Sequence, residues 1–180
     1  MTASIIELKA SLEDRRIAAL AAAGIGLTLA EAAIPLPIPG LKPGLANIVT
    51  LLVLYRYGWR LAAWVALLRI VAGALFLGSF LTPTFALSLA GGLASLLILA
   101  GAARLPQTWF GPVGLSLLAA FGHIGAQLLL VDVWLMPGVS LIGLLPLFLG
   151  AAWVTGLING LIVARLMQAP QPESRQTVTA

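Results

Sequence analysis

Five titratable side chains stand inside or at the edges of long apolar runs, and these are the residues that could do chemistry: Glu31, Lys42, Arg69, His123 and Asp132. A charge at membrane depth costs about 2.5–3.5 kcal/mol on insertion scales, so it usually has a partner and a function. Arg69 is the hardest of them to assign to packing, because a guanidinium cannot become neutral. Either it pairs with Glu31 or it binds an anionic group of a ligand, and both hold if the ligand displaces Glu31.

Polar residues are densest between Glu31 and Asn47. Three prolines alternate along residues 35–39, and such a run cannot lie inside a helix. A broken, polar stretch between two apolar segments is where transporters build binding sites. Asn47 and Thr50 open the next apolar segment, where free backbone N–H groups can receive an anion beside Lys42. A plain capped helix start is the alternative interpretation.

Three further polar side chains lie deep in the second half of the chain. His123 and Gln127 are one helical turn apart and therefore share a helix face, and Asn159 lies in the last apolar segment. For each of them, a ligand contact and a hydrogen-bonded interior residue both stay open. Asp132 is predicted at the outer end of its helix, with site membership as the minor interpretation. The predicted substrate-binding set is Glu31, Lys42, Asn47, Arg69, His123, Gln127 and Asn159.

The composition indicates a lipid environment. Hydrophobic residues make up 61% of the 180 residues, charged residues 9%, and the mean hydropathy is +1.07. A soluble domain of this length could not bury so much apolar surface. The net charge of +4 is spread along the chain, which argues against a nucleic-acid partner. With no cysteine and one histidine, we expect no disulfide, no metal site and no cofactor.

The apolar runs predict an all-α integral membrane protein with six transmembrane helices in one bundle: residues 16–34, 45–57, 59–77, 85–103, 113–131 and 141–167. The second is short for a full crossing, so it is tilted or crosses only partly. Residues 1–167 form the membrane domain, and residues 168–180 form a disordered polar tail. A signal peptide cleaved near Ala30 is the rival for the first helix. The long, partly acidic lead-in and the length of the apolar run favour a helix.

Basic residues set the expected orientation. With the N-terminus inside, the inner loops and tails hold Lys9, Arg15, Arg16, Arg56, Arg60, Arg104, Arg165 and Arg175. The outer loops hold only Lys42. The positive-inside rule therefore predicts that both termini are cytoplasmic. The three outer connections are rich in proline and glycine, and we expect them to roof a pocket that opens outward.

Small residues dominate the first apolar segment. Ala18, Ala22 and Gly26 form a stripe with a four-residue spacing, and such stripes let helices approach closely. The stripe either packs within the protein or docks another membrane protein, and both interpretations stay open.

The carboxylates are too scattered for the chemistry of a prenyl synthase. Transfer to a diphosphate needs clustered aspartates that hold magnesium, and this chain has no such motif. It also lacks a glycine-rich phosphate loop that ends in Lys-Ser or Lys-Thr. No Ser-His-acid arrangement is indicated. The sequence therefore predicts that the protein is not an enzyme.

Two stretches carry a resemblance to a known family. The first contains Ile34-Pro35, Pro37, Pro39-Gly40, Lys42 and Gly44-Leu45-Ala46-Asn47-Ile48-Val49-Thr50-Leu51. The second is Leu68-Arg69, followed by Gly78, Phe80, Pro83, Phe85 and Ser88-Leu89-Ala90-Gly91-Gly92. Over residues 18–164 the chain resembles the Gx transporter family, which is also labelled heptaprenyl diphosphate synthase component I.

That family is similar to the S components of energy-coupling factor transporters. The resemblance implies an S-component-like bundle with an outward pocket, and a first helix whose small residues dock an energy-coupling membrane protein with its ATPases. We therefore expect an importer component in the bacterial cytoplasmic membrane that captures a small, anionic substrate from the outer side. The runner-up is a non-catalytic membrane subunit that scaffolds isoprenoid or quinone synthesis or a membrane redox complex.

Overall fold

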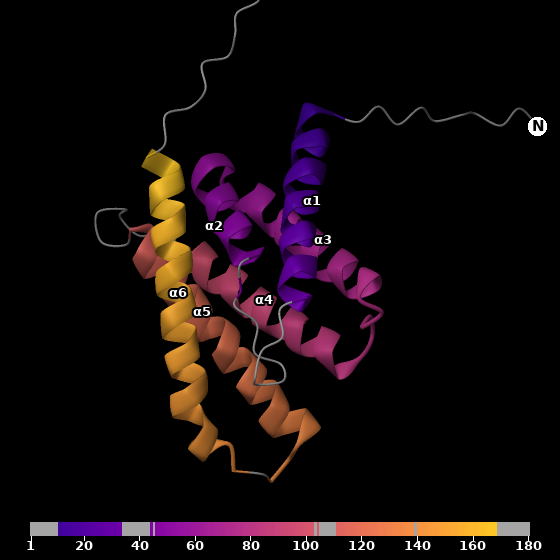
Figure 1. Cartoon of the computed structure of the whole chain (residues 1–180), viewed down its shortest axis with the longest axis vertical. Helices are drawn as coiled ribbons and strands as arrows, with labels where there is room; N and C mark the ends of the chain where they lie inside the picture. Colours follow the sequence, from indigo (N-terminus) through magenta and orange to yellow (C-terminus); the bar gives the residue numbers. More distant parts are fainter. Residues whose placement is uncertain are drawn as a thin grey trace, which may run out of the picture.

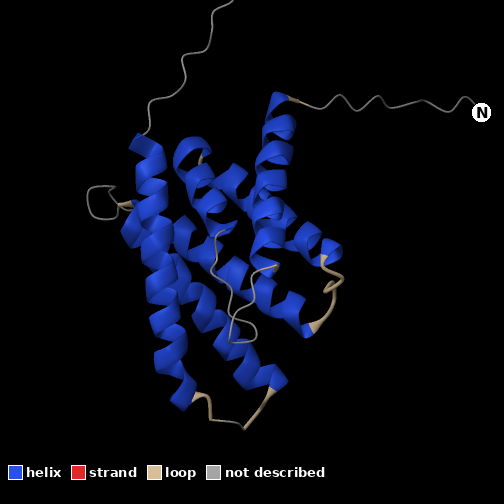
Figure 2. Ribbon diagram, viewed as in Figure 1, coloured by secondary structure: helices blue, strands red, loops and turns tan. Residues whose placement is uncertain are grey.

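The computed structural model describes residues 11–33, 44, 46–102, 104, 111–138 and 140–168. Within these residues the fold is entirely helical (Figure 2). The six α helices are α1 (Leu12–Ala32), α2 (Ala46–Tyr57), α3 (Trp59–Phe76), α4 (Pro83–Ala102), α5 (Pro112–Leu130) and α6 (Leu145–Gln168). A π-helical turn, η1 (Val131–Leu135), extends α5, and a short 3-10 turn, η2 (Ile142–Leu144), precedes α6.

Five of the helices form a closed ring. Each of α3, α4 and α5 packs against the next helix in the chain, and α2 closes the ring by contacting both α6 and α3. The first helix, α1, packs against α2 and α3 (Figure 1). Because all six helices take part in one packed bundle, side chains far apart in the sequence can meet inside it.

Four helical stretches are long and apolar enough to cross a membrane: Trp59–Phe76, Pro83–Ala102, Pro112–Leu135 and Ile142–Gln168. The helices α1 and α2 are not among these four described spans. The 12 residues of α2 are about 18 Å long, and a full crossing needs about 20 residues. Its first residue, Ala46, is completely buried. This helix therefore begins inside the bundle.

The start of α1 differs from the predicted position. The helix begins at Leu12, four residues before the expected Arg16. Ser11 and Asp14 form a capping box: the Asp14 backbone N–H donates to Ser11 Oγ, and Asp14 Oδ2 accepts from the Ser11 backbone N–H. A capping box can extend a helix into a polar segment. The spacing of apolar residues alone does not reveal such an extension.

The hydrophobic core fills one half of the ring. Its buried side chains come from the end of α2, the start of α3, the end of α4, the start of α5 and the end of α6: Val49, Leu51, Val53, Leu54, Leu61, Ala62, Val65, Leu99, Ala102, Leu115, Ala119 and Val163. The helix ends that carry Arg56, Arg60 and Arg165 belong to the same half. The apolar core therefore fills the interior of the bundle at the end that carries these arginines.

Candidate functional site

A cavity of about 200 Å³ lies inside the ring beside the core, and Leu51, Leu99 and Ala119 of the core line it. All six helices line it: the end of α1, the start of α2, the second half of α3, most of α4 and α5, and the middle of α6. Six of the seven predicted site residues line this one cavity: Glu31, Asn47, Arg69, His123, Gln127 and Asn159. The seventh, Lys42, lies outside the described residues.

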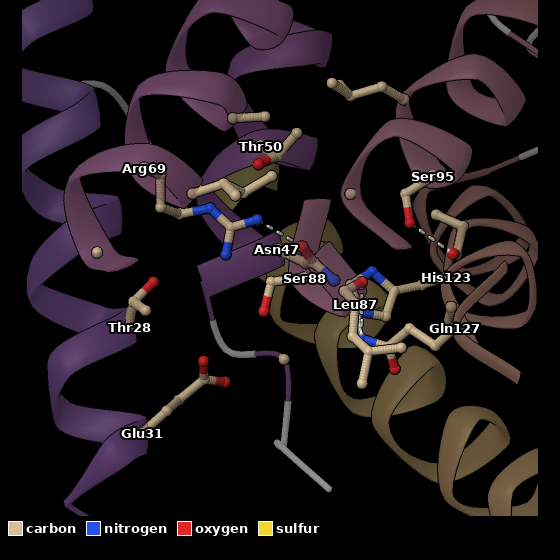
Figure 3. Close-up of a pocket in the computed structure, with 18 of the residues that line it drawn as sticks. Thr28, Glu31, Asn47, Thr50, Arg69, Leu87, Ser88, Ser95, His123 and Gln127 are labelled. Carbon is tan, nitrogen blue, oxygen red and sulfur yellow. Dashed lines mark hydrogen bonds between the residues drawn. The ribbon is translucent and has the colours of Figure 1, made fainter. Parts of the chain in front are cut away.

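Arg69 lies at the centre of the cavity wall on α3, and only 9% of its surface is exposed. Its Nη2 donates to Asn47 Oδ1 on α2 at 3.0 Å. Glu31 on α1 acts on the guanidinium as a nearby opposite charge. Arg69 and Glu31 approach the same side of the cavity from different helices, and Thr28 lies near them (Figure 3). The charged end of Arg69 is therefore held against α2 by Asn47 and faces a carboxylate across the cavity.

Two glycines make room for the two largest polar side chains of the site. A Cβ added to Gly24 on α1 would lie 2.9 Å from Cδ of Arg69. A Cβ added to Gly91 on α4 would lie 2.7–2.8 Å from three atoms of the His123 ring. Real Cβ atoms do not approach other atoms so closely, so any larger residue would displace these side chains.

A chain of hydrogen bonds ties the start of α2 to α6. Gly44, just before α2, has a φ of +71°, which favours glycine. Its carbonyl oxygen accepts from the Asn47 backbone N–H at 2.9 Å and from Asn159 Nδ2 at 2.9 Å. Asn47 in turn bonds to Arg69. These bonds join α6, α2 and α3, and they fix the buried beginning of α2 against the cavity.

His123 and Gln127 form a polar pair on the α5 wall, as their spacing predicted. Gln127 Nε2 donates to the Leu87 carbonyl oxygen of α4 at 3.3 Å and lies 3.1 Å from His123 Nε2. A carbonyl oxygen can only accept, so the NH₂ of Gln127 must face it. The same NH₂ then donates to His123 Nε2, which must carry no proton. The imidazole is therefore neutral, with its proton on Nδ1.

Hydroxyl side chains complete the polar lining, and most of them were not among the residues predicted from the sequence. Thr84, Ser88 and Ser95 lie on one face of α4, and Thr28 and Thr155 come from α1 and α6. Some already have backbone partners: Ser95 donates to the Ala119 carbonyl and Thr28 to the Gly24 carbonyl. The four-residue and seven-residue spacings in α4 are a helical pattern that could have revealed this polar face.

Three buried polar atoms at the cavity have no hydrogen-bond partner among the residues that the structure describes: Thr50 Oγ1, Arg69 Nε and Asn159 Oδ1. Their residues line the same cavity from α2, α3 and α6. Thr50 and Asn159 are each 5% exposed. Buried polar groups in native proteins are nearly always bonded, so such a group calls for a specific explanation.

Other sequence candidates lie away from the cavity. Asp132 is exposed in η1 and does not line the cavity.

The small residues Ala18, Ala22 and Gly26 are exposed on α1, and a Cβ on Gly26 would meet nothing within 4 Å. Among the described residues, this stripe is therefore not packed against another helix of the bundle. Across the described residues, no group of three or more acidic, histidine or cysteine side chains could hold a metal ion.

One known protein family matches the part of the chain that forms the site. The family model described as heptaprenyl diphosphate synthase component I matches residues 20–166, a segment that contains all of the cavity residues discussed above. Among curated proteins and among solved structures, none matches the chain.

Proposed function

The chain belongs to the heptaprenyl diphosphate synthase component I family, and from this premise we propose that it binds and transports a small acidic molecule. The observation that carries the proposal is Arg69, a buried guanidinium beside a cavity in an apolar helical bundle. Burying a cation among apolar helices costs free energy, and membrane proteins usually retain such a cation because it binds a ligand or lies on an ion pathway.

The acid group would sit against Arg69, Asn47 and Thr50. A guanidinium has five N–H donors in a planar fork that suits a carboxylate or a phosphate, and the bond to Asn47 uses one of them. The buried start of α2 adds backbone N–H groups and the positive end of a helix dipole. In transporters, half-helices with this arrangement direct their N-termini at anionic substrate groups.

Substrate would enter from the outer side of the bacterial cytoplasmic membrane. The cavity lies in the half of the bundle opposite the arginine-rich helix ends, and arginine-rich ends are expected on the cytoplasmic side. The apolar core blocks a path toward that side. Release inward would therefore need a conformational change, or a partner that drives one.

The partner would be an energy-coupling membrane protein with its ATPases, docked on the exposed Ala18, Ala22 and Gly26 stripe of α1. Close approach of helices through small residues is a common means of association in lipid. In this proposal the chain is the substrate-capturing component of an importer, similar to the S components of energy-coupling factor transporters, and it is not itself an enzyme.

A second candidate function follows from the family's printed description, which names a component of a synthase. In that case the chain would be a non-catalytic membrane subunit that anchors a catalytic partner for isoprenoid or quinone synthesis. The scattered carboxylates fit a non-catalytic role in either case. The two functions differ in whether the purified chain alone binds a small molecule.

Mass spectrometry of molecules that copurify with the chain tests the proposal. We expect an acidic small molecule to be released from the wild-type protein in lipid nanodiscs and to be missing from Arg69→Gln. The control is Gly125→Ala, because a Cβ at this exposed position of α5 meets nothing within 4 Å. A folded wild-type chain that carries no small molecule, and copurifies instead with a soluble prenyl synthase subunit, supports the second function.

A further inference from the structure

The three unpartnered atoms of the cavity differ in what they require from a ligand. Arg69 Nε is a donor only, and the Thr50 hydroxyl can also donate. Both therefore suit an oxygen of an acid group. Asn159 is different, because its Nδ2 is already bonded to the Gly44 carbonyl oxygen. That carbonyl can only accept, so the orientation of the amide is set, and Asn159 Oδ1 is left as an acceptor.

A simple acid cannot satisfy this arrangement. A carboxylate or a fully ionised phosphate has acceptor oxygens only, so it can bond to Arg69 and Thr50 but would repel Asn159 Oδ1. The carboxylate of Glu31, which lines the same cavity and is 4% exposed, adds further negative charge on the α1 side. Acceptor groups from α6 and α1 therefore line the cavity together with the donors of α2 and α3.

We infer that the ligand is an amphoteric small molecule, which carries an acid group and, on the same skeleton, an amine. This inference rests on the proposed function and deepens it. The acid group would bind Arg69 and Thr50, and the amine would donate to Asn159 Oδ1 in the field of Glu31. An ammonium group is favoured over a neutral donor, because a ligand with both charges matches a lining that presents one guanidinium and one carboxylate.

The test compares acids that share one carbon skeleton. Binding to the wild-type chain in nanodiscs would be measured for hexanoate, its α-hydroxy and α-amino derivatives, its ω-amino derivative, and hexylamine. We expect at least one amino acid of the set to bind about tenfold or more tightly than hexanoate, since a buried acceptor discriminates against ligands that leave it unbonded. The hydroxy acid should fall between them, and hexylamine should bind weakest.

Two variants of Asn159 connect this preference to the proposed atom. Asn159→Leu should remove the preference, so that the amino acid and hexanoate bind to this variant within about twofold of each other. Asn159→Asp also gives up the donation to the Gly44 carbonyl oxygen, but it keeps a carboxylate oxygen as an acceptor at this position, and it should retain the preference. Because both variants lose the bond to Gly44 and only Asn159→Asp keeps an acceptor, a loss confined to Asn159→Leu comes from the acceptor and not from the broken bond.

The outcomes separate this inference from the proposed function. If all the acids bind alike, and Asn159→Leu changes nothing, the ligand is a plain acid: the inference is overturned and the proposed function stands. If no acid of the set binds, or if Arg69→Gln binds every acid as the wild type does, the proposed function fails and the inference fails with it.

Discussion

The aliphatic part of the Arg69 side chain on α3 passes directly beside Gly24 on α1. A Cβ added to Gly24 would lie only 2.9 Å from Arg69 Cδ. The absence of a side chain at Gly24 therefore allows the guanidinium to reach Asn47 and the cavity. A methyl group at this position would force Arg69 into another rotamer.

Gly24→Ala should therefore weaken the binding of the acidic ligand about tenfold or more, which is about 1.4 kcal/mol. Gly26→Ala is the matched control, because it lies on the same helix and its Cβ meets nothing within 4 Å. Both changes raise helix propensity by about 1 kcal/mol, so a difference between them reports on Arg69. Binding is measured in nanodiscs, and equal affinities for the two variants would show that Arg69 adapts without cost.

The geometry of the guanidinium should matter as well as its charge. Arg69→Lys keeps a cation but cannot bond Asn47 and also present a planar fork to an acid group. We expect about a tenfold loss of affinity in Arg69→Lys and about a hundredfold loss in Arg69→Gln. Affinities are measured by titration of the wild type and both variants. Wild-type affinity in Arg69→Lys would indicate a simple point-charge interaction.

His123 should be a neutral imidazole with its proton on Nδ1, because Gln127 donates to Nε2. The sequence contains one histidine, so nitrogen NMR of a chain purified without a histidine tag reports on this ring alone. Gly91→Ala should change the ring's signals, because its Cβ would lie 2.7–2.8 Å from three ring atoms. The control on the same helix is Gly101→Ala, which meets nothing within 4 Å. Signals of a proton on Nε2 in the wild type would contradict the assigned tautomer.

The orientation in the membrane can be tested with single cysteines, since the natural chain has none. The start of α1 and the connection between α5 and α6 lie at opposite ends of the bundle (Figure 1). Ser11 directly precedes α1, and Ser140 belongs to that connection. In intact cells, a membrane-impermeant thiol reagent should label Ser140→Cys and leave Ser11→Cys unlabelled. The reverse pattern would place the cavity on the cytoplasmic side and would rule out capture from outside.

The exposed stripe on α1 should act in docking and not in folding. Gly26→Leu should reduce the amount of copurifying membrane partner by about tenfold, because close helix approach through small residues is lost. Gly125→Leu is the matched control on α5, since neither glycine has an atom within 4 Å of an added Cβ. Thermal stability and ligand affinity should be unchanged in both variants. Equal partner recovery from both would assign docking to another surface.

Much of the site could be predicted from residue type alone. Arg69, Asn159 and His123 were identifiable because polar groups in apolar segments are costly, and the helical spacing of His123 and Gln127 was enough to pair them. The polar face of α4 was missed, although its serines and threonine follow a helical pattern. The sequence suggested Glu31 as a partner of Arg69, and Glu31 acts on it as a nearby opposite charge. The hydrogen bond from Arg69 to Asn47 was not predicted.

By itself, the sequence determined the membrane environment, the helical segments and the polar residues among them, because these depend on local composition and on the period of one helix. It could not determine which residues face one another. The closing of the ring by α2 and α6, the space that Gly24 and Gly91 leave for Arg69 and His123, and the exposure of the α1 stripe depend on contacts between helices distant in the chain. Only tertiary packing decides such contacts, since a helical pattern defines a face but not the neighbour that covers it.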